Sequence, residues 1–262
     1  MKKITILFVS ALLLFGLIAC ETVPNPSDSA RPSDTPSPTD NTESILFEGK
    51  IVDVRDDTLL IAADSGEAGQ LLTLSIDGLD VIDAYGNAGY PTDFRTGTHV
   101  AITYDGTILE TYPMQLSNPT AIQVRDRSDD LVPFYLTVIR DLLEVDPGLN
   151  EDISVLALDL RALTNLTDAE TSALLYLSDR EFGAEARFAD FDTLVAEGLI
   201  VDSYFETGIL VRFTEMEETD EGFTFSVDKY RSGLGAYFFV DCTAVRGDGG
   251  IFFYTIGSEA IS

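Results

Sequence analysis

The sequence predicts an α+β protein in which a small all-β domain, residues 45–125, precedes an α+β domain, residues 126–262. In the first segment, short apolar runs alternate with polar residues and are separated by turn residues, a pattern typical of strands. In the second, apolar residues recur at helical spacing, and from residue 199 the strand pattern returns. Helices followed by an antiparallel meander predict helices packed on one face of a curved sheet.

The first twenty residues have the three parts of a secretory signal peptide. Lys2 and Lys3 form a basic head, and residues 4–19 are almost purely apolar but shorter than the about 20 residues of a membrane-spanning helix. The closing Leu-Ile-Ala-Cys, residues 17–20, resembles the lipobox of bacterial lipoproteins, in which the cysteine is acylated and becomes the first residue. The resemblance implies that lipidated Cys20 holds the protein on the extracytoplasmic face of the cell membrane. An ordinary signal peptide with an incidental Cys20 is the alternative.

Residues 21–44 predict a disordered tether, because they contain five of the ten prolines and almost no large apolar side chain. A flexible coil of this length spans roughly 27 Å, and more where proline keeps it extended. We therefore expect the tether to hold the folded part away from the lipid surface.

The charge and the cysteine content exclude two classes of protein. The chain has a net charge of −29, and removing residues 1–20 removes two lysines and no acidic residue, which brings the charge to −31. Such an acidic chain without a basic patch is not attracted to nucleic acid, so we expect no nucleic-acid partner. With Cys20 acylated, Cys242 has no partner cysteine, so a small fold held together by disulfides is excluded.

The expected strands of the first domain are each bounded by turn residues. They cover residues 45–54, 58–64, 71–77, 98–104 with a continuation to 112, and 120–125. Asp105-Gly106 is a strong signal for a two-residue hairpin in the fourth of these segments. The turn-rich insert 79–95 is expected to hold one helical turn. Five short strands with one irregular insert predict a small closed barrel of the oligonucleotide/oligosaccharide-binding (OB) type.

About 80 residues of this segment resemble a known kind of domain. Residues 105–113 (DGTILETYP, which includes Tyr112-Pro113) and residues 47–51 (FEGKI) resemble a small barrel domain of unknown function found on Gram-positive lipoproteins. The resemblance implies a barrel and membrane anchoring, and it implies no activity.

Two tyrosines of the first domain are candidates for function. Tyr104 and Tyr112 are able to form a stacking platform for a sugar or a peptide, and the alternative for both is a place in the core or in a cross-strand pair. His99, the single histidine, is interpreted as a surface or half-buried packing residue rather than as a ligand or a base.

The second domain is expected to begin with a helix. Residues 126–130 look like the start of a calcium loop, but Leu131 and Thr137 occupy the places of its Gly and Glu, so the segment is interpreted as a helix start. Helical spacing continues to residue 142, Thr167 and Glu170 form a capping box for a second helix, and Asp190 can cap a third. The expected strands are 153–160, 208–213, 223–230, 235–245 and 251–256. By analogy alone, this order is similar to cystatin-like and NTF2-like folds.

Two groups of charged residues are candidate sites. Four acids at one hairpin tip are weak candidates for binding calcium, with a solvated loop as the alternative. They are Glu217, Glu218, Asp220 and Glu221. Lys229, Tyr230 and Arg231 form the densest basic spot, a candidate for receiving an anionic group. The alternative there is an exposed strand end paired with nearby carboxylates.

Two further motifs are interpreted as structural. Cys242 lies in an apolar strand beside Asp241, a setting that predicts a buried, unreactive thiol. Residues 246–248 spell the adhesion tripeptide Arg-Gly-Asp, but within R-G-D-G-G they are typical of a hairpin turn.

The functional prediction depends on the anchor and on motifs that the sequence lacks. We find no H-E-x-x-H, Walker loop, G-x-S-x-G or paired C-x-x-C. We therefore expect a binding or assembly module without catalytic activity or cofactor, whose partner is a cell-envelope protein or a glycan. The alternative is a hydrolase that cleaves cell wall or glycan with two carboxylates, which no segment identifies. A solute-capture lipoprotein is a third hypothesis, but the chain is small and lacks two α/β lobes.

Overall fold

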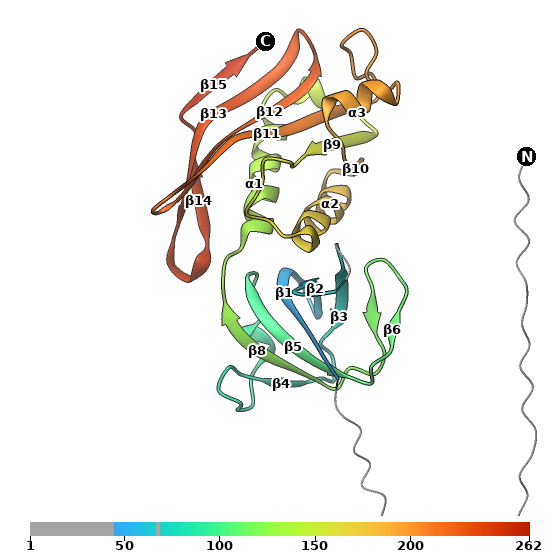
Figure 1. The fold of residues 1–262 in the computed structure, drawn as a ribbon, viewed down its shortest axis with the longest axis vertical. Helices are drawn as coiled ribbons and strands as arrows, with labels where there is room; N and C mark the ends of the chain where they lie inside the picture. Colours follow the sequence, from blue (N-terminus) through green and yellow to red (C-terminus); the bar gives the residue numbers. More distant parts are fainter. Residues whose placement is uncertain (1–44, 67–68) are drawn as a thin grey trace, which may run out of the picture. The chain divides into compact units, whose positions relative to one another are not determined.

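The computed structural model describes residues 45–66 and 69–262, which form an α+β fold (Figure 1). The predicted signal peptide with Cys20, residues 1–20, and the predicted tether, residues 21–44, lie outside the described residues. The described residues all belong to one compact unit. Its two main sheets are an N-terminal sheet within residues 45–127 and a C-terminal sheet within residues 155–261.

The N-terminal sheet has the spatial strand order β3-β2-β1-β5-β8-β4. Neighbouring strands are antiparallel except β4 and β8, which are parallel. A separate two-stranded pair, β6 with β7, lies in the chain between β5 and β8. The bounds are β1 Ile45–Arg55, β2 Thr58–Ala63, β3 Leu71–Ser75, β4 Asp80–Ile82, β5 Thr98–Tyr104, β6 Ile108–Leu109, β7 Gln115–Leu116 and β8 Ala121–Arg127.

Both faces of β2 are buried, each in a different core. Leu59 and Ile61 are fully buried in the apolar core of the N-terminal sheet, together with Ile102 of β5. Leu60 and Ala62 point to the opposite side, because successive side chains of a strand alternate. They are buried as well, in the core that contains α1 and α2. Strand β2 therefore lies between two packed layers.

The five expected strands of this segment are confirmed, with bounds that shift by a few residues. The expected helical turn is the 3-10 helix Pro91–Asp93. The expected hairpin at Asp105-Gly106 is wrong, because β6 pairs with β7 and not with β5. Asp105 instead accepts a hydrogen bond from the backbone N–H of Thr107 at 2.9 Å. Strand β4, three residues long, is not among the expected elements.

The C-terminal half contains α-helices and a second, larger sheet. The helices are α1 Leu131–Glu144, α2 Asp168–Phe182 and α3 Phe191–Ala196. The strands are β9 Val155–Asp159, β10 Glu185–Phe188, β11 Gly208–Thr219, β12 Gly222–Ser232, β13 Gly235–Arg246, β14 Phe252–Thr255 and β15 Ser258–Ile261. The expected helices and the expected strands are confirmed, and β10 and β15 are additional.

The C-terminal sheet has the order β10-β9-β11-β12-β13-β14, and β15 also pairs with β13. Strands β11 to β14 form the expected antiparallel meander. Strands β10, β9 and β11 are parallel, so a purely antiparallel sheet is wrong at this edge. The reason is the α2 crossover from β9 to β10, since parallel neighbours require a long connection of this kind.

The helices cover both faces of this sheet, whereas the sequence predicts helices on one face. Leu156 of β9 and Ile209 of β11 pack in the core with α1 and α2. The adjacent Ala157 and Leu210 face the other side and pack with Leu194 of α3. Strands that are apolar on both faces need a cover on each side, and the short helix α3 provides the second one.

Helix α2 begins at the capping box that the sequence predicts. The Thr167 hydroxyl accepts a hydrogen bond from the Glu170 N–H at 3.2 Å, and the Glu170 carboxylate accepts one from the Thr167 N–H at 2.9 Å. Gly183 ends the helix in the left-handed region, with φ 66°. The capping box also fixes the position of the buried Glu170 carboxylate.

The outer face of the N-terminal sheet shares an apolar core with helices α1 and α2. Four side chains from the outer face of that sheet belong to the same buried cluster as Leu142 of α1 and Leu174 of α2. They are Val52, Leu60, Ala62 and Leu71. The two segments that the sequence separates are thus in direct apolar contact.

Candidate binding site

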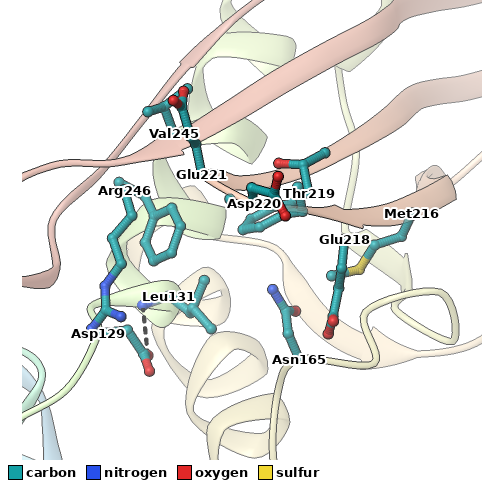
Figure 2. A pocket seen from close by; sticks show the side chains of 13 residues that line it. Asp129, Leu131, Asn165, Met216, Glu218, Thr219, Asp220, Glu221, Val245 and Arg246 are labelled. Carbon is teal, nitrogen blue, oxygen red and sulfur yellow. Dashed lines mark hydrogen bonds between the residues drawn. The ribbon is translucent and has the colours of Figure 1, made fainter.

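A pocket with a volume of about 650 Å³ opens at one end of the C-terminal sheet (Figure 2). We call it the acidic pocket. It is formed by the β11–β12 hairpin, the end of β13, the start of α1, the loop before α2 and the start of β14. Its lining residues are Asp129, Leu131, Asn165, Met216, Glu218, Thr219, Asp220, Glu221, Gly222, Phe223, Val245, Arg246 and Phe252.

A β-bulge in β11 shapes one wall of the acidic pocket. The pairing with β12 shifts between Thr214 and Glu217, and Glu215 lies in the left-handed region with φ 55°. The inserted residue changes which side chains face inward. Met216 is half-buried against the core, whereas Glu217 and Glu218 are exposed. The bulge therefore places an acidic edge beside an apolar surface.

The tip of this hairpin requires a glycine. Thr219 pairs with Gly222, so Asp220 and Glu221 form the two-residue turn. A Cβ atom at Gly222 would lie 2.1 Å from the carbonyl oxygen of Ala244 on β13. The close approach of β12 to β13 at Gly222 fixes the turn, and the turn places Asp220 and Glu221 at the pocket rim.

The pocket combines an apolar floor with an acidic rim. Leu131 and Phe223 are buried, and the Phe223 ring lies 5.4 Å from that of the half-buried Phe252. Figure 2 shows Asp129 and Arg246 on one side of the pocket and Glu218 on the other. These surroundings suit a ligand that is both cationic and partly apolar.

Two charged residues of the pocket already have partners. A carboxylate oxygen of Asp129 lies 2.8 Å from the Lys50 ammonium, and the Arg246 guanidinium donates to the carbonyl oxygen of Ser128 at 2.7 Å. The exposed carboxylates of Glu218, Asp220 and Glu221 give the rim its excess negative charge. Among the acids that the sequence proposes for calcium, Glu217 does not line the pocket.

The geometry does not favour a metal site at this hairpin. In the described part of the chain, no group of three or more His, Cys, Asp or Glu residues is arranged to hold a metal ion. The hairpin acids spread along the rim and do not converge on one point, as the oxygen ligands of calcium have to. They remain available to an organic cation.

The basic spot at Lys229, Tyr230 and Arg231 is used inside the fold. The Lys229 ammonium is fully buried and donates to backbone carbonyl oxygens at the end of α1, including that of Leu143 at 3.3 Å, and to the Asn150 side chain at 3.3 Å. The interpretation of this residue as part of an exposed strand end is wrong, because the terminal carbonyls of a helix attract a cation.

The other two residues of this spot also contact backbone carbonyls. The Tyr230 hydroxyl donates to the carbonyl oxygen of Ser203 at 2.7 Å. The Arg231 guanidinium donates to Leu149 at 2.9 Å and to Glu206 at 2.8 Å. Their polar groups therefore connect the strand to neighbouring loops, and the hydrogen bonds leave little donor capacity for an anionic ligand.

The two candidate tyrosines of the N-terminal sheet lie in different environments. Tyr104 is buried in the core of the sheet, so it cannot act as a platform. Tyr112 is 68% exposed, and its ring packs edge-on against Tyr176 of α2 with centroids 6.0 Å apart. We call Tyr112 and Tyr176 the tyrosine pair. Sequence reasoning missed Tyr176, because it belongs to the other half of the chain.

The remaining candidates have structural surroundings. The His99 ring nitrogens lie 3.2 Å from Asp64 Oδ2 and 3.1 Å from Ser128 Oγ. Cys242 is buried, and burial with the neighbouring Asp241 raises the pKa of its thiol to about 11. The Arg-Gly-Asp tripeptide leads from β13 into the 3-10 turn Asp248–Gly250, as the turn interpretation expects.

One buried carboxylate has the raised pKa that an acid catalyst needs, but its oxygens are occupied. Burial raises the pKa of Asp228, while Arg212 acts in the opposite direction. The Arg212 guanidinium binds both carboxylate oxygens, at 3.0 and 3.1 Å. The acids of the acidic pocket are exposed instead. No observation here specifically favours the hydrolase alternative.

Comparison with known proteins finds no matching family model, curated protein or solved structure. Within residues 45–66 and 69–262, none of the helices combines the length and the apolar character needed to cross a membrane. Function is therefore inferred from the geometry of the pocket and of the tyrosine pair.

Proposed function

We propose that this chain is a lipid-anchored extracytoplasmic binding module without catalytic activity, and that the acidic pocket receives a cationic group of its partner. The observation that carries the proposal is the pocket itself, with an apolar floor at Leu131 and Phe223 below three exposed carboxylates. Ligand sites are concave and mostly apolar, with a few polar groups that fix orientation.

Electrostatics support a cation as the ligand. The net charge of −31 that remains after residues 1–20 are removed attracts cations over the whole surface, and a concave site with apolar walls concentrates that field. The half-buried ring of Phe252 adds an aromatic surface on which an ammonium or guanidinium group can lie. A lysine or arginine side chain of an envelope protein has the required chemistry. Such binding weakens as salt screens the rim.

We also propose finer fold assignments for the two halves. The N-terminal sheet is an OB-type barrel that is partly open between β3 and β4, the two ends of its strand order. The C-terminal half is a cone of the cystatin or NTF2 kind by analogy, since α1 packs against the meander strands β12, β13 and β14.

The anchor is tested by fractionation. Cys20→Ala is expected to release the protein from the membrane fraction or to block its processing, because a lipobox requires the cysteine as the acylated residue. Ser65 is exposed and lies outside the lipobox, so Ser65→Ala is the control that should fractionate with the wild type. Membrane association of the Cys20→Ala protein at the wild-type level would contradict the anchor.

The pocket is tested by calorimetric titration with hexalysine. We expect the variant Glu218→Gln/Asp220→Asn/Glu221→Gln to bind about tenfold more weakly, since each exposed ion pair contributes up to about 1 kcal/mol. The matched control removes three exposed acids outside the pocket: Glu144→Gln/Glu151→Gln/Asp152→Asn. Equal affinities of the two variants would mean that net charge, and not the pocket, attracts the peptide, and the proposal would then fail.

A further inference from the structure

The tyrosine pair exposes aromatic surface where two parts of the chain meet. Tyr112 lies between β6 and β7, Tyr176 lies on α2, and their rings meet at an interplanar angle of 84°. Tyr112 remains 68% exposed despite this contact. The edge-on packing fixes the orientation of the Tyr112 ring and leaves much of its surface open to a ligand.

An arginine accompanies the pair one helical turn further along α2. The guanidinium carbon of Arg180 lies 5.5 Å from the centroid of the Tyr176 ring, and Nη1 donates to the Tyr176 hydroxyl at 3.4 Å. Arg180 is exposed, and no carboxylate in the described part of the chain forms an ion pair with it. The chain has 45 acidic and 16 basic residues, but none of the described acids pairs with this guanidinium. The Arg180 guanidinium therefore keeps hydrogen-bond donors that a ligand can use.

Two cavities lie next to the tyrosine pair, and each is lined by one of its members. The first, about 520 Å³, is bounded by Tyr112 and by the exposed Ile108 and Leu109, with Glu110 among its polar groups. The second, about 270 Å³, is bounded by Tyr176 and Arg180, with carboxylates on β1 and the turn after it. Each ring of the pair thus borders one of the two spaces.

We propose that the tyrosine pair and Arg180 form a glycan-binding site, separate from the acidic pocket. The apolar C–H face of a sugar ring stacks on Tyr112, and Arg180 and Glu110 bind its hydroxyl groups, as donor and acceptor respectively. Unlike the acidic pocket, this site carries cations and carboxylates in near balance. Such a balance fits an uncharged ligand that is rich in hydroxyl groups. The exposed Ile108 and Leu109 suit the methyl group of an N-acetylated sugar.

The test is a titration of the full-length protein in detergent, followed by saturation-transfer NMR. The probes are the β-1,4-linked tetramers of N-acetylglucosamine and of glucose. We expect the N-acetylated tetramer to bind, with Tyr112→Ala and Arg180→Ala each weakening the affinity by about fivefold or more. Tyr85→Ala and Arg95→Ala are matched controls, because both residues are exposed and neither lines the two cavities.

Each outcome decides the proposal. Binding that falls in Tyr112→Ala and Arg180→Ala but not in the controls supports a glycan site, and a preference for the N-acetylated tetramer supports the role of Ile108 and Leu109. The proposal would be overturned if neither tetramer bound at millimolar concentration, or if all four variants bound the N-acetylated tetramer equally. The glycan site and the acidic pocket share no lining residue, so Tyr112→Ala and Arg180→Ala should leave hexalysine binding unchanged. Either proposal can therefore fail without the other.

Discussion

The ammonium nitrogen of Lys50 in β1 lies 2.8 Å from a carboxylate oxygen of Asp129, which lies two residues before the first residue of α1. The same ammonium contacts the buried carboxylate of Glu170 in α2. Lys50 thus joins the N-terminal sheet to both helices. It also places Asp129 at the edge of the acidic pocket.

Lys50→Met should destabilise the protein by about 3 kcal/mol, because it leaves the buried Glu170 carboxylate without its cation. Chemical denaturation gives the free energy of unfolding. The double variant Lys50→Met/Glu170→Gln should recover part of this loss, since no uncompensated charge remains. A double variant less stable than Lys50→Met would contradict the role assigned to the pair.

The Lys50 pair also predicts a pH dependence. Burial lowers the pKa of Lys50, but hydrogen bonds to Asp129 and Glu170 outweigh it and the net shift is upward. The folded state therefore holds the proton more tightly than the unfolded state. The contribution is fully present below the ordinary lysine pKa of about 10.4 and is lost as pH rises through the higher folded value. The stability difference between wild type and Lys50→Met should shrink above that pH.

The shared core predicts that residues 45–262 unfold in one cooperative transition. Leu60 and Leu71, from the N-terminal sheet, are buried in the cluster that contains α1 and α2. Differential scanning calorimetry should show a single peak for the wild type. Leu60→Asp places a charge in this interface and should split or broaden the peak. Two separate transitions in the wild type would mean that the interface does not couple the two sheets.

Lys229→Met should cost about 2 to 4 kcal/mol, since the carbonyl oxygens at the end of α1 lose their buried donor. Burial lowers the pKa of Lys229 to about 8, against the opposing effect of Asp146. Between about pH 8 and the ordinary value of about 10.4, the unfolded state binds more protons, so the wild type gains stability with pH. Titration of unfolding free energy against pH should show this gain in the wild type and not in Lys229→Met.

Cys242 should be inert towards a thiol reagent in the folded protein. Its pKa of about 11 leaves about one thiolate in a thousand at pH 8, and the side chain is fully buried. Reaction with a disulfide reagent, in a Cys20→Ala background, should follow global unfolding. Rapid labelling without denaturant would show that the thiol is accessible.

Local signals in the sequence predict much of the fold. Alternating runs predict β1, β2, β3, β5 and β8, and the Thr167–Glu170 capping box predicts the start of α2. Strands β4 and β10 escape detection because three or four residues are too few to show alternation. The side of the sheet that α3 covers is also not encoded locally, since it depends on tertiary packing.

The candidate sites are less predictable than the strands. The acids at the β11–β12 hairpin are visible in the sequence, but Asn165 and Phe252, which complete the pocket, come from distant segments. Lys229 looks like a surface cation because its partners are carbonyl groups, which leave no trace in the amino-acid pattern. Tyr176 becomes a candidate only when the fold brings α2 against Tyr112.

The central claim is that the acidic pocket binds a cationic group of an envelope partner outside the membrane. The most direct test places a photo-crosslinking residue at Thr219, on the pocket rim, and at Glu151, an exposed control position, in the anchored protein of intact cells. If the acidic pocket is the binding site, position 219 gives a reproducible crosslinked species that is absent from position 151 and that added hexalysine abolishes. Identical products from both positions, or a product that hexalysine does not displace, would contradict it.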